Sequence, residues 1–423
     1  MAMVFISCRI QWRINYIRPS TRINQHQMRK IASLFLFFIF VQSGFAQTAS
    51  EYYQSPFDTT ISSASLGEKR AFTVILPRTF NKANASKFPL IIVFDRQNKR
   101  IFRQIFESIN YLVSFDEAPE AVIIGVHTQN NRNRLLETSL LASDPGAKGE
   151  KFVDFIFREL IPFAEKEYNC SKDRFLIGHS RFGYFSSYML ANKLNEVSGV
   201  TSLSPFFIQK NVNIVDSLKA SLAKNKPAHH VYYRFVIGDT LSDTNDYLQM
   251  RSFLRNNRLP ATFDWKDTEF FNAVHMATPG LGIMPALFEM FNYWATSSEK
   301  ILRDEKAIFN SEQYARFKSA MKDHYGDSIG LSISTLNGIA YKYYNTARYN
   351  EAIAAWKIVL QDYPAFSEAY IRIADSYRKS GNRSEALKAY QTAQLKLASS
   401  SFYNGQERTE LMMDIEDGMK EVK

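Results

Sequence analysis

Short apolar runs alternate with segments of helical apolar spacing along residues 60–295. The apolar runs predict strands at 71–76, 89–95, 121–126, 199–204, 231–238 and 261–264. The helical spacing predicts helices at 150–168, 247–254 and 285–294, the last with its proline in the first turn. This alternation predicts an α/β fold with a mostly parallel sheet that is covered by helices on both faces.

One strand-to-helix junction in this region has the composition of a nucleophile elbow. The apolar run 175–178 ends at Gly178, Ser180 follows, and an apolar helical segment begins after Gly183. A serine hydroxyl is a poor nucleophile unless it is held clear of the sheet, facing a base, with backbone amides ready for an oxyanion. The usual pattern places a glycine two residues after the serine, and here Phe182 occupies that position. A plain strand–turn–helix with an incidental serine is the alternative.

A candidate general base follows in the chain order that such a serine requires. His275 lies in the predicted loop 272–279, directly before the last helix. His229 and His230 precede a predicted strand, and we expect them to be exposed loop residues. The sequence therefore favours His275 as the base.

The acid of a Ser–His–Asp triad has two candidates in the sequence. Asp239 and Asp243 both follow the strand 231–238, where a carboxylate can orient an imidazole and stabilise its cation. Asp246 is assigned to the first helical turn, which favours acidic residues through the helix dipole. A Ser–His dyad without an acid is the remaining alternative.

Several stretches together resemble a known family. They are SLGEKR at 65–70 with VILP at 74–77, FPLIIVFD at 88–95, the segment 149–168 and the serine–proline strand end 202–205. Over residues 60–295 the chain resembles the esterases related to ferric-enterobactin esterase and esterase D, within the α/β-hydrolase superfamily. The resemblance implies cleavage of carboxylic esters, with Ser180 as nucleophile and His275 as base. It also implies an oxyanion site formed by the backbone amide of Arg181 and that of Arg96 or Gln97.

The sequence departs from this family in ways that concern the substrate. Arg96 stands where relatives usually have glycine, and the stretch 132–135 keeps two arginines but lacks the usual aspartate. If Arg132 and Arg134 lie near Arg96 and Arg181, they favour an anionic ester. Otherwise these four arginines are solvated surface residues.

A repeat of period 34 occupies residues 336–396. The matching pairs are Ile339/Ile373, Ala340/Ala374, Tyr343/Tyr377, Ala352/Ala386 and Trp356/Tyr390. This period and spacing are similar to those of tetratricopeptide repeats. Two such units rarely bury a stable core alone, so we expect further helices at 313–324 and 405–420. The repeats either bind a protein partner or only stabilise the chain or its dimer.

The N-terminal region predicts export. Residues 29–30 are basic, an apolar run follows at 31–41, and small residues follow at 44–46, which describes a signal peptide that starts at Met28. The apolar run is too short for a typical span of ~20 residues, so we expect no transmembrane span after cleavage. The formal charge of +10 includes six basic and no acidic residues of 1–46 and falls to +4 without them, which gives no reason to expect nucleic-acid binding.

These observations predict four parts: residues 1–46 (extension and signal peptide), 47–298 (α/β-hydrolase), 299–330 (linker or helix) and 331–423 (helical repeats and tail). Removal of Cys8 with the signal peptide would leave Cys170 alone, so no intramolecular disulfide is expected. No Cys/His cluster has metal-ligand spacing, and we expect neither a metal nor a cofactor. The sequence thus predicts a periplasmic or secreted serine esterase. The alternative is an inactive hydrolase-fold scaffold whose repeats bind a partner.

Overall fold

The computed structural model describes residues 52–82, 87–141, 143–238, 244–304, 307–400 and 402–422. The predicted signal peptide and both acid candidates, Asp239 and Asp243, lie outside these residues. Within the described ranges, no helix combines the length and the hydropathy needed to cross a membrane.

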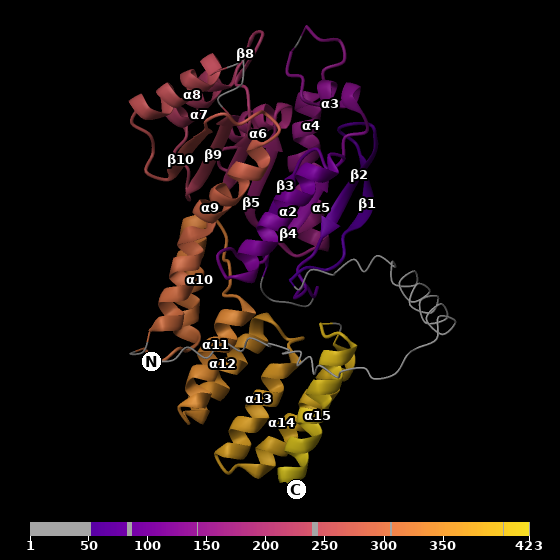
Figure 1. Cartoon of the computed structure of the whole chain (residues 1–423), viewed down its shortest axis with the longest axis vertical. Coiled ribbons are helices and arrows are strands. Elements are labelled where there is room, and N and C mark those ends of the chain that lie inside the picture. The colour runs from indigo at the N-terminus through magenta and orange to yellow at the C-terminus, as the bar shows by residue number, and fades with distance from the viewer. Residues whose placement is uncertain are drawn as a thin grey trace, which may run out of the picture. The chain divides into compact units, whose positions relative to one another are not determined.

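Eight strands form one sheet in the order β1-β2-β4-β3-β5-β6-β9-β10 (Figure 1). Their bounds are β1 Phe57–Ser63, β2 Glu68–Ile75, β3 Phe88–Val93, β4 Val122–Val126, β5 Cys170–His179, β6 Gly199–Leu203, β9 Val231–Gly238 and β10 Phe263–Phe270. β2 pairs antiparallel with β1 and β4, and all other neighbours are parallel. The strands β7 (Ile208–Gln209) and β8 (Val212–Asn213) form a separate hairpin. The predicted α/β fold is therefore confirmed.

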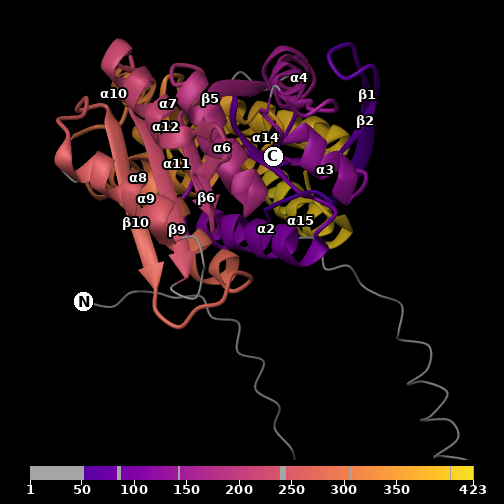
Figure 2. The ribbon, with the colours of Figure 1, turned by 90° about the horizontal axis from the view of Figure 1, so that it is seen from above.

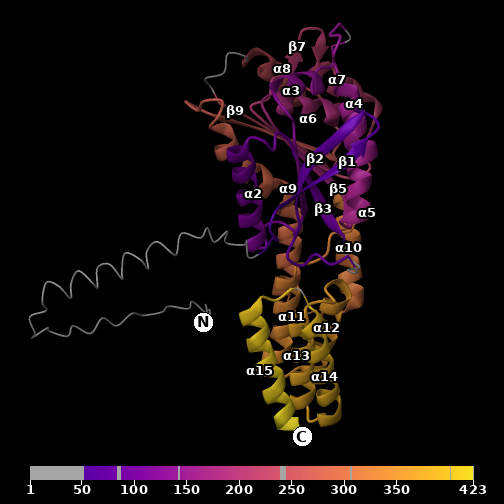
Figure 3. The ribbon, with the colours of Figure 1, turned by 90° about the vertical axis from the view of Figure 1, so that its right-hand side faces the viewer.

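Helices cover both faces of the sheet, as the alternation predicts. The helices α2 (Lys99–Ser114) and α9 (Thr278–Arg303) pack on one face. The other face carries α4 (Gly149–Asp154), the π-helical turn Phe155–Leu160, α5 (Ile161–Glu167), α6 (Arg181–Asn192), α7 (Ile214–Lys224) and α8 (Thr244–Asn256). Figures 2 and 3 show α2 and α4 on opposite sides of the strands. Alternate residues of each strand feed the two cores, for example Ile91 on the α2 face and Leu90 on the α6 face.

The last helix of the sheet region differs from its prediction. It begins at Thr278 with Pro279 in its first turn, so Pro285 lies inside the helix instead of at its start. An interior proline removes one backbone hydrogen bond and normally breaks a helix. Here Ile283 before the proline and Trp294 after it are both buried in this core, and this burial stabilises the helix on both sides of Pro285.

Six more helices follow the sheet. They are α10 (Ser311–Tyr325), α11 (Ile333–Asn345), α12 (Tyr349–Asp362), α13 (Ser367–Lys379), α14 (Arg383–Ser399) and α15 (Gly405–Val422). The helices α11 and α13 begin 34 residues apart, as do α12 and α14. The repeated small residues Ala340 and Ala374 are fully buried. The helical repeat and the two additional helices are confirmed, whereas membership of the tetratricopeptide class stays a prediction.

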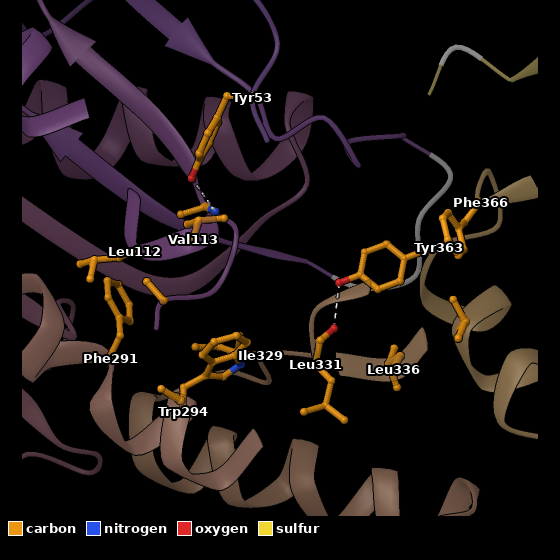
Figure 4. Packing of buried hydrophobic residues seen from close by; sticks show 14 of the residues in the cluster. Tyr53, Leu112, Val113, Phe291, Trp294, Ile329, Leu331, Leu336, Tyr363 and Phe366 are labelled. Carbon is orange, nitrogen blue, oxygen red and sulfur yellow. Dashed lines mark hydrogen bonds between the residues drawn. The ribbon is translucent and has the colours of Figure 1, made fainter. Parts of the chain in front are cut away.

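The sheet and the C-terminal helices share one core. A continuous cluster of buried apolar residues runs from Tyr53 through α2 and α9 to Val422. Figure 4 shows the part of this cluster around Trp294 and Tyr363. The indole N–H of Trp294 donates to the carbonyl of Gly330 at 2.9 Å. The hydroxyl of Tyr363 donates to the carbonyl of Leu331, also at 2.9 Å. The end expected for the hydrolase part, at residue 298, lies inside α9, which continues to residue 303.

Candidate active site

Strained backbone gathers at the carboxyl ends of three neighbouring strands. Asp95 follows β3, Ser180 follows β5 and Ser204 follows β6, and their φ angles are +60°, +59° and +46°. Residues other than glycine rarely adopt positive φ, and such strain persists where the surrounding structure imposes it, often at functional sites. Three strained residues at one edge of the sheet therefore mark this edge as the candidate site.

Ser180 has the backbone of a nucleophile elbow. It precedes α6 with φ 59° and ψ −120°, and its N–H donates to the carbonyl of Leu203 at 2.8 Å. A Cβ at Gly178 would lie 2.1 Å from the carbonyl oxygen of Phe182, so only glycine permits this close approach of strand and helix. The tight turn places the serine at the N-terminus of α6, where backbone amides and the helix dipole favour negative charge.

The aromatic departure from the usual motif does not enter the site. The Phe182 side chain is fully buried in the core beneath α6 and stacks on Phe94 with ring centroids 5.0 Å apart. Gly183 instead contacts the end of β6, where a Cβ would lie 3.2 Å from the Leu203 carbonyl oxygen. The second glycine of the motif has therefore moved by one residue without filling the space near Ser180.

His275 is held against His179, the residue before Ser180, through its own backbone carbonyl. This carbonyl accepts hydrogen bonds from Nε2 of His179 at 3.2 Å, from Oγ of Ser204 at 3.4 Å and from Oγ1 of Thr278 at 3.0 Å. The imidazoles of His179 and His275 lie in contact, with ring centroids 4.7 Å apart. Among the described residues, neither the Ser180 hydroxyl nor the His275 imidazole makes a side-chain hydrogen bond, so no hydrogen bond joins the two. Catalytic hydrogen bonds are often long in unliganded enzymes and tighten on binding.

His179 is a positioning residue that the sequence analysis missed. A carbonyl oxygen only accepts, so Nε2 of His179 carries a proton. Burial lowers the pKa of His179 to about 4, which keeps this side chain neutral in that tautomer at physiological pH. The motif gave no signal for it, because the position between Gly178 and Ser180 accepts many residues.

The loop that carries His275 crosses the end of β9. A Cβ at Gly238 would lie 2.0 Å from the carbonyl oxygen of Ala273, which makes this glycine necessary for the crossing. Nδ1 of His275 is buried without a hydrogen-bond partner among the described residues. Asp239 and Asp243 follow Gly238 in the sequence and lie outside the described residues.

The other polar residues near these elements are already engaged. Asp246 lies in the first turn of α8, as predicted, and its carboxylate accepts from the backbone N–H of Phe207 and from that of Ile208 at 3.1 Å. The expectation that His229 and His230 are exposed is wrong. Both are half-buried: His229 contacts the carbonyl of Val197, and the His230 ring stacks on a residue of α10.

Only one of the two further oxyanion candidates is available in this conformation. The Arg96 N–H donates to the carbonyl of Val126 at 3.0 Å and cannot also face an oxyanion, which corrects its assignment. The Gln97 N–H makes no hydrogen bond among the described residues. Its side chain is held by the N–H of Thr128 at 3.0 Å and by Asp95 at 2.8 Å. The amides of Arg181 and Gln97 remain as the predicted oxyanion donors.

The arginines separate into two groups. Nε of Arg134 donates to Asp95 at 2.7 Å, and its guanidinium lies 5.8 Å from the Phe182 ring centroid. Burial lowers the pKa of His275, and the positive charge of Arg134 lowers it further. Arg132 is exposed and forms no ion pair within the described part of the chain. Arg134 is therefore part of the site, whereas Arg132 lies on the outer surface of α3 (Asn131–Glu137).

Arg181 is a cation without a carboxylate partner among the described residues. Its guanidinium lies 5.6 Å from the Phe206 ring centroid. With its amide oxygen turned toward Arg181, Gln209 accepts from both guanidinium nitrogens at 3.1 and 3.3 Å. Burial and the charge of Arg134 both lower the pKa of Arg181, as expected for a cation that lacks a counter-ion. The site therefore carries positive charge next to Ser180.

Comparison with known proteins supports this description. Residues 63–259, somewhat less than half of the chain, match the family described as Putative esterase. An uncharacterised protein from Capnocytophaga ochracea superimposes with a TM-score of 0.54 at 18% identity, covering 86% of this chain and 100% of that one. An IroE-like serine hydrolase from Shewanella oneidensis superimposes with a TM-score of 0.57 at 15% identity, covering 71% and 98%. A search of curated proteins found no match.

Fold and comparisons together define the class. The chain has an α/β-hydrolase fold followed by a C-terminal helical region. The match to the esterase family supports hydrolysis of esters by the matched segment.

Proposed function

We propose that this protein is an exported serine esterase, with Ser180 as nucleophile and His275 as general base. The strained elbow at Ser180, with the His275 carbonyl bound by the neighbouring His179, is the observation that carries this proposal. Export rests on the signal peptide predicted from the sequence, which places the enzyme in the periplasm or outside the cell.

The proposed reaction has two steps. Oγ of Ser180 attacks the ester carbonyl while the His275 imidazole takes its proton, and the amides of Arg181 and Gln97 stabilise the oxyanion. The imidazolium then returns the proton to the departing alcohol, which leaves an acyl-serine. Water, deprotonated by the same imidazole, releases the acid and restores Ser180. Asp239 or Asp243 would orient His275 through the buried Nδ1.

The arginines support an anionic ester as substrate. Arg134 is neutralised by Asp95, whereas Arg181 has only a neutral amide and an aromatic ring as partners. A carboxylate or a similar group on the substrate would supply the missing negative charge beside Ser180.

The nucleophile is tested with a fluorophosphonate probe and a short-chain aryl ester. The wild-type protein should be labelled and should hydrolyse the ester, whereas Ser180→Ala should do neither and should keep its melting temperature. Failure of the wild-type protein to react would overturn the enzymatic proposal. It would favour an inactive hydrolase-fold scaffold whose helical repeats bind a protein partner.

The substrate class is tested with a matched pair of esters, one bearing a carboxylate and one neutral. The charged ester should show the higher kcat/KM, and the preference should shrink as salt rises. Arg181→Leu should abolish the preference, whereas Arg132→Leu, at an exposed position of equal charge, should keep it. Equal cleavage of both esters at every salt concentration would contradict this part of the proposal.

A further inference from the structure

A cavity of about 200 Å³ lies at the edge of the sheet opposite to Ser180. Its walls come from segments far apart in the sequence: residues 52, 78, 79, 113, 116, 118, 120, 332–334 and 402. Glu120 lies two residues before β4, whereas Ser180 follows β5, so the cavity lies near the amino ends of the strands. The cavity is thus separate from the candidate active site and is formed jointly by the sheet region and the C-terminal helices.

The cavity wall carries two carboxylates that lack a cation. Glu120 accepts a hydrogen bond from Thr79, and neither Glu120 nor Asp116 forms an ion pair among the described residues. The nearby Arg78 is already engaged, because it pairs with Glu407 and donates to the carbonyl of Phe402 at 3.0 Å. Burial, and then the charge of Asp116, raise the pKa of Glu120 to about 7.

The rest of the lining is mainly apolar. Val113 and Ala118 come from the sheet region, and Ile333 and Phe402 come from the helical region. The guanidinium of Arg78 lies 5.0 Å from the Phe402 ring centroid, which fixes that ring at the edge of the cavity. A pocket with apolar walls and a few convergent polar groups is the usual form of a small-molecule site.

We propose that this cavity binds a small primary amine with an apolar body, with its ammonium group at Glu120 and Asp116. The ammonium group supplies the positive charge that the two carboxylates lack, and the apolar body contacts Val113, Ile333 and Phe402. The volume admits a ligand of about ten non-hydrogen atoms. Because the walls belong to both parts of the chain, the amine also strengthens the packing of the helices against the sheet.

Phenethylamine is the probe, and 2-phenylethanol and phenylacetate are its neutral and anionic counterparts. Isothermal titration calorimetry on the full-length protein at about pH 8 should give saturable binding of phenethylamine alone. The same amine should raise the melting temperature in a concentration-dependent way. Glu120→Gln should weaken binding by about tenfold or more, because it removes a charge-assisted hydrogen bond. Asp116→Asn should weaken it less.

The variants are chosen to stay folded. Glutamine at position 120 keeps an acceptor for Thr79 and removes a poorly solvated charge. Glu117→Gln is the matched control, because it removes an acidic charge one residue from Asp116 that does not line the cavity. The proposal would be overturned if 2-phenylethanol bound as well as phenethylamine, if the protein preferred phenylacetate, or if it did not bind phenethylamine at millimolar concentration. It would also be overturned if Glu120→Gln bound phenethylamine as tightly as the wild type. None of these readouts depends on esterase activity.

Discussion

The contact between Gly238 and Ala273 gives a quantitative prediction about the base. A methyl group at Gly238 would lie 2.0 Å from the Ala273 carbonyl oxygen, whereas ordinary van der Waals contact begins at 3.4 Å. In Gly238→Ala the loop that carries His275 must therefore move by about 1.4 Å. Displacement of a catalytic group by about 1 Å can cost about 100-fold in rate. We expect kcat/KM to fall by about two orders of magnitude, which is about 2.7 kcal/mol of transition-state stabilisation.

The assay is hydrolysis of a short-chain aryl ester, read together with thermal unfolding. Overpacking at one residue costs typically about 1–3 kcal/mol of stability, so Gly238→Ala should remain folded at assay temperature. Gly280→Ala is the control, because a Cβ there has no heavy atom within 4 Å although the residue lies only five positions after His275. It should keep wild-type activity. If Gly238→Ala retained kcat/KM within twofold of the wild type, the loop crossing would not position the base.

Three further predictions follow from the same geometry. His275 must be neutral to act as the base, so kcat/KM should increase with pH, and the midpoint of this increase should lie below the ordinary histidine pKa of about 6.5. Arg134→Gln should move this midpoint upward, because it removes a positive charge that lowers the pKa of His275, and Arg134→Lys should not. Asp239→Asn or Asp243→Asn should lower turnover by up to about 10⁴-fold if that residue orients His275, and near-full activity of the double variant would indicate a dyad. Truncation after residue 304 should expose the apolar face of α9 and cause aggregation on size-exclusion chromatography, whereas a monomeric, active fragment would contradict a single core.

Much of the fold could be predicted from local sequence patterns. The strand 231–238 was predicted with the bounds that the structure shows, because a fully buried parallel strand is a largely apolar run between polar loops, interrupted here by Arg234. The edge strand β10 was predicted only at its start, because its later residues are mostly polar and partly exposed and therefore do not form an apolar run. The elbow at Ser180 could be predicted from the sequence, because the glycine at position 178 and the start of the following helix are features of neighbouring residues in the chain.

The sequence by itself predicted the α/β alternation, the 34-residue repeat and the candidate pair Ser180 and His275, because each is visible in local patterns and in their order along the chain. Only the tertiary structure revealed that His179 donates a hydrogen bond to the His275 carbonyl and that the Arg96 amide donates to the Val126 carbonyl. These interactions join residues from different strands and loops, so they depend on how the strands are ordered in the sheet. The same holds for the shared core, since the burial of Trp294 against Gly330 depends on how α9 packs with the helices that follow.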